Sequence, residues 1–368
     1  NEKTGRIFRI MPEKSLAQDF PGRYSDLNKM SDAQLVALQT NSSDWHSRRA
    51  RGILHKRAVN KKLDSKTNPA LKVIFSTHKN QYVILGVTGP NEYENNVNNN
   101  FYTNYIAKWC IDYAAEQIQK VSLEYPSDHK RVIEKVNLSD AELQDWKKVA
   151  DNMYFPQSEE LGVYLQQDGF LDKELVRVAD LDRSQRPINQ KWSWDRILRS
   201  PYIKQADVLQ CFYFFEDHFS KEQLKNNFEF YESFTVHESS LSPCVHSIQA
   251  ATMGRMEQAY TFYLRTSRLD LDDYNKEVEE GLDITSMAGT WMSIVEGFGG
   301  MRVKNDALHF EPRIPKEWNG YSFKINFRNQ ILKVSVHQHE TNFTLEGDTS
   351  ISVFVNGKEI DRNTEYFK

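Results

Sequence analysis

The spacing of hydrophobic residues changes twice along the 368-residue chain, which divides it into three regions. In the first, residues 1–72, the segment GRIFRI (5–10) has the pattern of a strand, and SDAQLVALQ begins as a helix capped by Ser31. The segment DWHSRRARGILHKRA (44–58) predicts a basic amphipathic helix, followed by a polar linker. We interpret its cluster of three arginines (Arg48, Arg49, Arg51) as a solvated helix face rather than a nucleic-acid contact.

Helical patterns joined by polar loops fill the second region, residues 73–299. Four aromatic residues recur every four positions, which places them on one helix face: Phe101, Tyr105, Trp109 and Tyr113. Further helical patterns cover residues 141–154, 204–219, 242–264 and 286–298, the first of them opened by a capping signature at Ser139 and Glu142. Helix following helix predicts a helical bundle or an α-helical barrel rather than a Rossmann sheet.

In the third region, residues 300–368, hydrophobic residues recur at every second position. The segments YSFKINF (321–327), ILKVSV (331–336) and ISVFVNGK (351–358) alternate apolar and polar residues, and Asn356–Gly357 is a hairpin signal. The fold class we expect is therefore mainly α, followed by a small C-terminal antiparallel β domain.

The amino-acid composition limits which classes of binding partner and cofactor we expect. With 47 basic and 51 acidic residues the net charge is −4, so we expect neither nucleic-acid nor membrane partners. No apolar run reaches the roughly 18 residues of a membrane span, and the first residues lack an apolar signal core, which predicts a cytoplasmic location. Three widely spaced cysteines indicate reduced thiols, and the absence of CxxC and HExxH motifs predicts no metal and no cofactor. The 12% aromatic content is typical of a packed core, or of platforms for sugar rings.

The most unusual segment is VTGPNEYENNVNNNFYTN (87–104), where seven of the fourteen residues from Asn91 to Asn104 are asparagine. Asparagine is unfavourable inside helices and strands, so the segment predicts an ordered polar loop. Glu92 lies in this loop after Gly89–Pro90. Cleavage of a glycosidic bond needs a carboxylic acid beside the leaving oxygen, and Glu92 is a candidate for it, although a single loop glutamate is more often only a surface residue.

Five long segments, in the same order and at fitting intervals, resemble glycoside hydrolase family 65, most closely the maltose phosphorylases within it. They are residues 86–109 (GVTGPNEYENNVNNNFYTNYIAKW), 191–210, 231–251 (YESFTVHESSLSPCVHSIQAA), 269–303 and 308–318 (LHFEPRIPKEW). The resemblance implies part of an (α/α)6-barrel, the six-hairpin glycosidase type, over residues 73–299, and a C-terminal β-sandwich over 300–368. Residues 1–72 do not resemble this family and are faintly similar to the end of a propeller-type dehydrogenase.

The resemblance also implies a set of site residues. Glu92 matches the proton donor, and Lys204, Gln205 and Asn91 match positions that contact the sugar, while His237 and Glu238 line the site, although a buried structural histidine is an equal alternative. Phosphate would be held by TSMAGTW (285–291), through Thr285, Ser286, Ala288 and Gly289. For that segment, tight helix packing through Ala288 and Gly289 is the alternative.

The reaction implied is inverting phosphorolysis of maltose to β-glucose 1-phosphate and glucose, with a disaccharide and phosphate as the partners and a homodimer left open. This sequence departs from the family pattern at two points that bear on the implied reaction. Asp283 occupies the position of a family histidine that helps to hold phosphate, and its carboxylate would repel the anion. The half-barrel that carries the family's glucose-binding Trp-Asp pair has no counterpart in residues 1–72. The alternatives are therefore an inactive fragment or interaction module, or an inverting α-glucoside hydrolase that uses Asp283 as its base.

Overall fold

The computed structural model of the chain describes residues 25–38, 49–50, 53–54, 57, 73–346, 351–360 and 365–367. The chain divides into two compact units, Asn1–Val73 and Ile74–Lys368. The strand expected at residues 5–10 lies outside the described residues, as do Arg48 and Arg51 of the basic cluster.

The first unit has a short described core. A 3-10 turn, η2 (Leu27–Lys29), precedes helix α1 (Asp32–Ala37). The Gln34 amide N–H donates to Ser31 Oγ at 3.3 Å, and the Ser31 N–H donates to Gln34 Oε1 at 2.9 Å. This reciprocal capping box confirms the predicted helix start. Leu27, Leu35 and Ile53 are among the residues buried in the core of this unit.

Helices make up most of residues 74–299. The α-helices are α3 (Phe101–Glu124), α4 (Pro126–Val136), α5 (Asp140–Asp151), α6 (Ile188–Lys191), α7 (Trp194–Arg199), α8 (Val208–Phe214), α9 (Lys221–Glu232), α10 (Ser242–Thr252), α11 (Met256–Ser267), α12 (Leu269–Asp272) and α13 (Ile284–Met292). A π-helical turn, η10 (Ser293–Phe298), continues α13. The 3-10 turns are η5 (Phe170–Asp172), η6 (Val178–Asp180), η7 (Arg183–Gln185), η8 (Glu216–His218) and η9 (Val278–Glu280). Two small antiparallel hairpins, β1 (Ile74–Ser76) with β2 (Gln81–Val83) and β3 (Gln157–Ser158) with β4 (Val163–Tyr164), lie on the polar connections.

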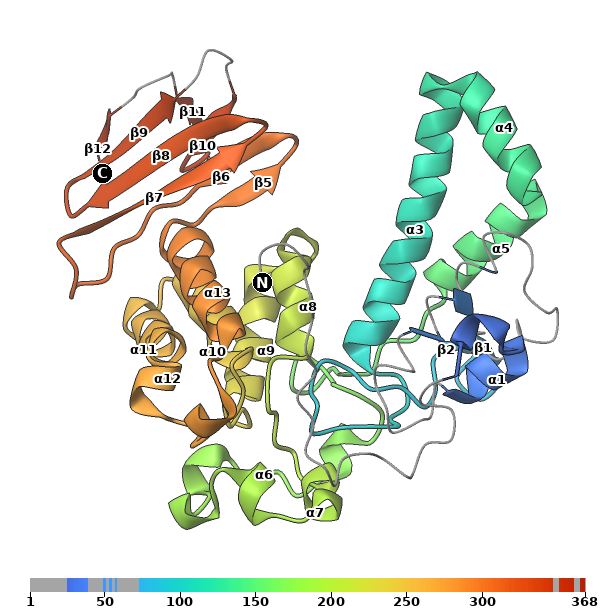
Figure 1. Cartoon of the computed structure of the whole chain (residues 1–368), viewed down its shortest axis with the longest axis horizontal. Coiled ribbons are helices and arrows are strands. Elements are labelled where there is room, and N and C mark those ends of the chain that lie inside the picture. The colour runs from blue at the N-terminus through green and yellow to red at the C-terminus, as the bar shows by residue number, and fades with distance from the viewer. Residues whose placement is uncertain are drawn as a thin grey trace, which may run out of the picture. The chain divides into compact units, whose positions relative to one another are not determined.

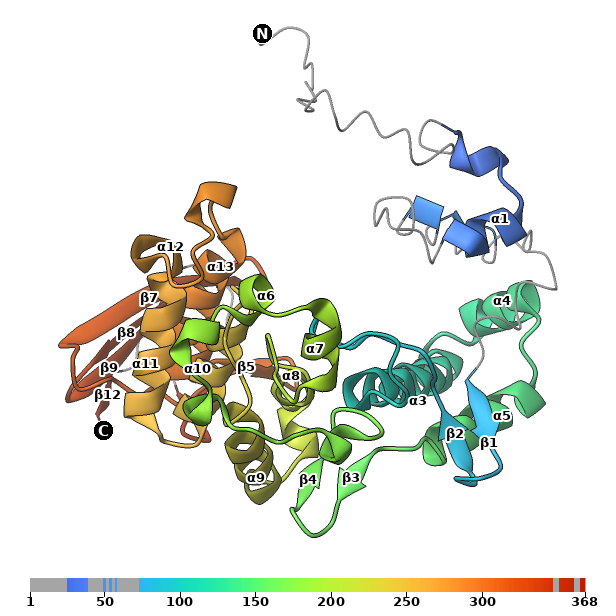
Figure 2. The ribbon, with the colours of Figure 1, turned by 90° about the horizontal axis from the view of Figure 1, so that it is seen from below.

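The core of the helical body is centred on α10, which packs against α8, α11 and α13 (Figures 1 and 2). Every residue from Ser242 to Ala251 is buried. Small side chains such as Ala250 and Ala251 let the neighbouring helices approach closely. The sequence pattern over residues 242–264 therefore corresponds to two helices, separated at Gly254, where φ is +75°.

The aromatic face predicted for residues 101–113 lies on α3. At the start of the helix, Phe101 is fully buried and stacks on Tyr164, with ring centroids 4.4 Å apart. Further along the same face, Trp109 and Tyr113 stack on each other and are 38% and 48% exposed. The first turn of α3 is thus fixed in the core, while its later part extends with α4 and α5 away from α8 (Figure 1).

The C-terminal domain contains two four-stranded sheets. One has the order β11 (Lys358–Ile360), β10 (Val353–Val355), β6 (Ala307–Phe310), β5 (Arg302–Lys304), and the other β12 (Glu365–Phe367), β9 (Glu340–Glu346), β8 (Gln330–His337), β7 (Gly320–Phe327). Residues from both sheets, including Phe310, Val334 and Val355, share one apolar core. The pairing of β10 with β6 is parallel, whereas the sequence led us to expect antiparallel pairing throughout. Alternation defines the buried face of a strand but not the direction of its neighbour.

The mainly helical fold with a small C-terminal β domain is thus confirmed. Among the helices in the described ranges, none is both long and apolar enough to span a membrane.

Candidate active site

The asparagine-rich loop presents Glu92 to solvent between buried neighbours. It connects β2 with α3, and in it Asn91, Tyr93 and Glu94 are 1%, 2% and 5% exposed. The Glu92 side chain is 57% exposed. The backbone of this segment is therefore fixed on both sides of the residue that the sequence marked as the proton donor.

Asn91 anchors the loop through its backbone and its side chain. Its N–H donates to Asp207 Oδ2 at 3.0 Å. Its Oδ1 accepts the N–H of Lys204 at 2.9 Å and that of Tyr93 at 3.2 Å. In this structure the Asn91 side chain therefore joins the loop to the segment that carries Lys204, and its expected contact with sugar stays a prediction.

Tyr93 ties the other side of Glu92 to a buried carboxylate. The Tyr93 hydroxyl donates to Glu238 Oε2 at 3.0 Å, and Glu238 also accepts the Ile188 N–H at 2.8 Å. Arg186 Nε lies 3.1 Å from the second oxygen, Oε1. Because Glu238 is 3% exposed and all these partners belong to the protein, it supports the loop that carries Glu92.

Glu94 forms a buried ion pair with Lys173. The Lys173 ammonium also donates to the Ser200 carbonyl oxygen at 3.0 Å, and burial lowers the pKa of Lys173 to about 8. Breaking this pair would leave an isolated charge in a buried position, which is expensive. The pair is therefore a third anchor of the same loop.

Lys204 and Gln205 lie beside Glu92, and their expected contact with the sugar stays a prediction. The Lys204 ammonium donates to Glu92 Oε2 at 2.6 Å, and Gln205 Nε2 donates to the Pro90 carbonyl oxygen at 2.8 Å. Partial burial pushes the pKa of Glu92 up, but the hydrogen bond and the charge of Lys204, with a bond from Gln205, outweigh it, so that the net pKa is lowered. Glu92 is therefore held as a carboxylate.

His237 belongs to a separate buried network. Its Nδ1 lies 2.8 Å from Ser242 Oγ and its Nε2 lies 3.3 Å from Glu232 Oε2, an oxygen that is also 2.6 Å from His246 Nδ1. Burial, offset in part by Glu232, lowers the pKa of His237 to about 4, so the ring is neutral at pH 7. This arrangement matches the alternative of a buried structural histidine.

The same three residues form the one cluster in the described ranges with ligand atoms close enough for a metal ion. Both separations from Glu232 Oε2 are those of hydrogen bonds or of an ion pair within the protein. The ring of His246 is fully buried, and its Nε2 has no hydrogen-bond partner among the described residues.

The expected phosphate-binding residues lie at the start of α13. Asp283 precedes this helix and its side chain does not cap it, while Ser286 is buried and donates its hydroxyl to the Asp283 carbonyl oxygen at 2.7 Å. Thr285 is exposed, and its Oγ1 lies 2.6 Å from Ser240 Oγ. This pair joins α13 to the segment after His237, and Ser240 is a residue that the sequence did not single out.

Ala288 and Gly289, the two small residues of that segment, have different surroundings. Ala288 is exposed. Gly289 is buried, and a Cβ there would lie 2.8 Å from Cys244 Cβ and 3.1 Å from its Sγ. Gly289 therefore serves close packing of α13 on α10, whereas Ala288 does not.

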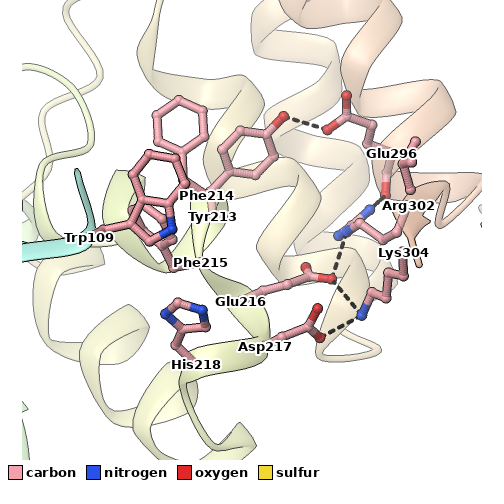
Figure 3. A pocket seen from close by; sticks show the side chains of 11 residues that line it. Trp109, Tyr213, Phe214, Phe215, Glu216, Asp217, His218, Glu296, Arg302 and Lys304 are labelled. Atoms are coloured by element: carbon pink, nitrogen blue, oxygen red, sulfur yellow. Dashed lines mark hydrogen bonds and ion pairs between the residues drawn. The ribbon is translucent and has the colours of Figure 1, made fainter. Parts of the chain in front are cut away.

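A cavity of about 420 Å³ lies elsewhere, beside α8, η8 and β5 (Figure 3). Its aromatic lining includes Trp109 and Phe214, but its charged groups are paired with each other. Arg302 Nε lies 2.8 Å from Glu216 Oε1, and Lys304 Nζ lies 2.6 Å from Asp217 Oδ1. None of the predicted site residues lines it, so we assign the candidate site to the Glu92 loop.

Three anchors of that loop were missed from the sequence: Lys173, Arg186 and Asp207. Each lies far along the chain from residue 92. Lys173 and Arg186 are in segments without a motif that we recognised as chemical, whereas Asp207 lies just after Lys204 and Gln205 in residues 191–210 and was still not singled out. Asp207, before an apolar helical run, has the signature of an ordinary helix cap.

Comparisons with known proteins agree on one family. Residues 70–292 match the pattern of the glycosyl hydrolase family 65 central catalytic domain, and residues 301–362 match the family's C-terminal domain. Over 274 residues the chain is 53% identical to the maltose phosphorylase of Bacillus subtilis (strain 168), a match that covers 74% of this chain and 35% of the relative. An alpha,alpha-trehalose phosphorylase of Thermoanaerobacter brockii is 43% identical over 281 residues, covering 76% of this chain and 36% of the relative.

Among solved structures, one described as a kojibiose phosphorylase from the human microbiome superposes with a TM-score of 0.72 at 36% identity. The match covers 80% of this chain and 40% of that chain. The chain thus spans well under half the length of these relatives.

Proposed function

Because the chain belongs to glycoside hydrolase family 65, a family of disaccharide phosphorylases, we propose that its Glu92 loop supplies the proton donor for phosphorolysis of an α-glucoside. The observation that carries the proposal is the exposure of the Glu92 carboxylate between three buried, anchored neighbours, 2.6 Å from Lys204. A fixed backbone under a solvent-facing acid is the arrangement that general acid catalysis requires.

In the proposed reaction, a phosphate oxygen forms a bond to C1 of the non-reducing glucose while the bond from C1 to the leaving oxygen breaks. Glu92 gives its proton to that oxygen, which leaves as a sugar hydroxyl. Attack from the face opposite the leaving group inverts the configuration at C1. Phosphate is already ionised, so no base is needed.

The contact between Lys204 and Glu92 sets the protonation state. In the free site Lys204 favours the carboxylate, which is the form that accepts a proton when the reaction runs toward disaccharide synthesis. For phosphorolysis, Glu92 has to bind a proton, and we infer that a sugar hydroxyl takes over the Lys204 ammonium when substrate binds. Lys204 thus acts both as a sugar contact and as a control on the pKa of Glu92.

Phosphate is proposed to bind near the start of α13, close to Thr285 and Ser286. Ser240 is within hydrogen-bond distance of Thr285, so its hydroxyl can join this site. Asp283 is the residue that opposes phosphate binding, because an ionised carboxylate repels the anion.

We propose maltose as the substrate. The support is the higher identity to a maltose phosphorylase, 53%, than to a trehalose phosphorylase, 43%. The matches cover only 35% and 36% of these two relatives.

The test is to incubate the purified protein with phosphate and, in parallel, maltose, trehalose or kojibiose, and to assay glucose 1-phosphate. We expect phosphate-dependent β-glucose 1-phosphate from maltose and at least about tenfold less from the other two sugars. Equal release from a second sugar would contradict the substrate assignment, and no product from any sugar would support an inactive fragment.

A hydrolase is the second candidate. It is favoured by the Asp283 carboxylate, which makes no capping hydrogen bond to α13. In that case water replaces phosphate and Asp283 accepts its proton. Glucose release from maltose without phosphate, lost in Asp283→Asn, would support the hydrolase.

A further inference from the structure

Asp207 stands at the N-cap position of α8, but its side chain makes no capping hydrogen bond to that helix. An aspartate at this position usually accepts an N–H of the first helical turn. Here the backbone carbonyl of Asp207 accepts the N–H groups of Gln210 and Cys211, at 3.1 and 3.3 Å, while the carboxylate is directed elsewhere.

The carboxylate joins two other segments. Asp207 Oδ2 accepts the N–H of Asn91, the residue before Glu92, at 3.0 Å. Asn100 Nδ2 donates to Asp207 Oδ1 at 2.9 Å and to its Oδ2 at 3.2 Å, and also to the Gln166 carbonyl oxygen at 3.2 Å. Asn100 in turn caps α3, because its Oδ1 accepts the N–H and the hydroxyl of Thr103 at 2.9 and 2.8 Å. One side chain thus connects the start of α8, the Glu92 loop and the start of α3.

The loop is packed so closely on this carboxylate that there is no room for another atom. A Cβ on Gly89 would lie 2.4 Å from Asp207 Oδ2 and 2.3 Å from Asn100 Nδ2. Both distances are too short for a real Cβ, so only glycine fits at residue 89. The Gly89–Pro90–Asn91 backbone therefore packs directly against the side chains of Asp207 and Asn100.

Keeping an acid here is costly for the fold. Asp207 is 2% exposed, and within the described part of the chain no lysine, arginine or histidine lies within ion-pair distance of it. Burial raises its pKa to about 7, even though the bonds from Asn91 and Asn100 lower it. A buried carboxylate without a cation is unfavourable. Its presence here points to a role for its two acceptor oxygens.

We propose that Asp207 is a positioning residue for the candidate acid: it accepts from Asn91 and Asn100 at once and thereby sets where the Glu92 backbone stands relative to α3 and α8. The inference rests on the proposed function for its catalytic consequence, but its structural part can be measured separately.

An isosteric substitution, Asp207→Asn, distinguishes the roles of the two carboxylate oxygens. In Asp207→Asn the remaining oxygen can still accept the Asn91 N–H and the longer bond from Asn100, but the NH2 group that replaces Oδ1 faces the NH2 group of Asn100 at the closer contact. Asn100 cannot turn its amide without losing the cap on Thr103. Two donors then oppose each other in a buried place, and the junction opens.

The chain also offers a rescue. In the double variant with Asp207→Asn and Asn100→Asp, donor and acceptor are exchanged across the junction: the amide at 207 donates to the carboxylate at 100, and aspartate is a good cap for Thr103. The exchange is partial, because Asn100 Nδ2 also donates to the Gln166 carbonyl oxygen at 3.2 Å and this bond is lost. A requirement for the hydrogen-bonded junction predicts recovery, whereas a requirement for the charge at residue 207 does not. Asp182→Asn is the matched control, because Asp182 caps the exposed turn η7 through Ser184 N–H at 2.9 Å.

The experiment combines amide hydrogen exchange of residues 87–100 with the kinetics of phosphorolysis. We expect Asp207→Asn to speed exchange in this loop about tenfold or more and to lower kcat about 10- to 100-fold, with KM changed by less than about threefold. The double variant should recover at least about threefold of each loss, short of the parent because the bond to the Gln166 carbonyl oxygen is missing, and Asp182→Asn should change neither.

Unchanged loop exchange in Asp207→Asn would overturn the inference. If exchange rises throughout, including residues 242–252 of α10, the double variant decides: recovery supports the junction and no recovery overturns it. A parent protein without phosphorolysis would refute the proposed function alone, since the exchange measurements still test the positioning role.

Discussion

At the scale of single residues, the site depends on a contrast in exposure over four positions. Glu92 faces solvent while Asn91, Tyr93 and Glu94 are buried, and each buried neighbour has a partner distant in sequence: Asp207, Glu238 and Lys173 respectively. Partial burial is outweighed by the hydrogen bond and the charge of Lys204, which lower the pKa of Glu92. The proposed chemistry thus rests on one carboxyl group, and its placement on the carboxylates of Asp207 and Glu238 and the ammonium of Lys173.

Replacing Asp283 by histidine should strengthen phosphate binding. An ionised aspartate repels phosphate, whereas histidine can donate a hydrogen bond and, when protonated, offset part of the anion's charge. We expect Asp283→His to improve the binding free energy of phosphate by about 1–3 kcal/mol, measured by calorimetric titration. Asp145→His, on the exposed face of α5, should leave it unchanged. Equal affinities of the parent and Asp283→His would show that residue 283 does not contact the anion.

The buried network of His237 predicts a loss of stability in acid. Unfolded His237 binds a proton near pH 6.5, but the native ring does so only near 4, because burial lowers its pKa. Between these values the unfolded state binds more protons, so the free energy of unfolding falls as the pH falls, by up to about 1.4 kcal/mol per unit.

This contribution can be isolated with His237→Asn, since asparagine tolerates the left-handed backbone at this position, where φ is +53°. Urea denaturation at pH 7 and pH 5 should show a smaller pH effect for the variant than for the parent. The same difference in both proteins would mean that His237 titrates normally.

At the scale of elements, periodicity and caps predicted most helices and strands. The cap at Ser139 is formed, with Glu142 N–H donating to its hydroxyl at 3.2 Å. The Asn356–Gly357 hairpin is also formed, with φ of +48° and +77°. The parallel pair β10–β6 was not predicted, because alternation carries no information on a neighbour's direction. The role of Asp207 was not predictable either, because its partners are 107 and 116 positions away.

The close packing of α13 on α10 predicts that Gly289→Ala is destabilising. The added Cβ would lie 2.8 Å from Cys244 Cβ, so the two helices have to separate. We expect the free energy of unfolding to fall by about 1–3 kcal/mol in chemical denaturation. Ala288→Ser, on the exposed side of the same helix, should change it by less than about 0.5 kcal/mol. Similar values for both variants would contradict the assigned packing.

At the scale of the whole molecule, the chain combines two compact units, and nearly all of the match to family 65 falls in the second. Family 65 patterns cover residues 70–292 and 301–362, while the division between compact units falls at Val73. The first unit has its own small core of residues such as Leu35 and Leu54. We therefore expect the two units to unfold independently.

Deleting residues 1–68 should leave the main thermal transition of the protein within a few degrees of the parent value. The reason is that residues 74–368 contain the helical core and the β domain, each with its own buried apolar cluster. Differential scanning calorimetry measures the transition. A large fall in the melting temperature would show that the first unit stabilises the second.

The central claim, that Glu92 is the proton donor, is tested most directly by comparing two glucosyl donors in Glu92→Gln. With maltose and phosphate, the variant should lose about 10²- to 10⁴-fold in kcat, because glutamine has the same shape but no proton to transfer. With α-glucosyl fluoride and phosphate, it should keep most of its rate, because fluoride leaves without protonation. Glu159→Gln, an exposed glutamate in another loop, should match the parent on both donors. An undiminished rate of maltose phosphorolysis in Glu92→Gln would contradict the claim.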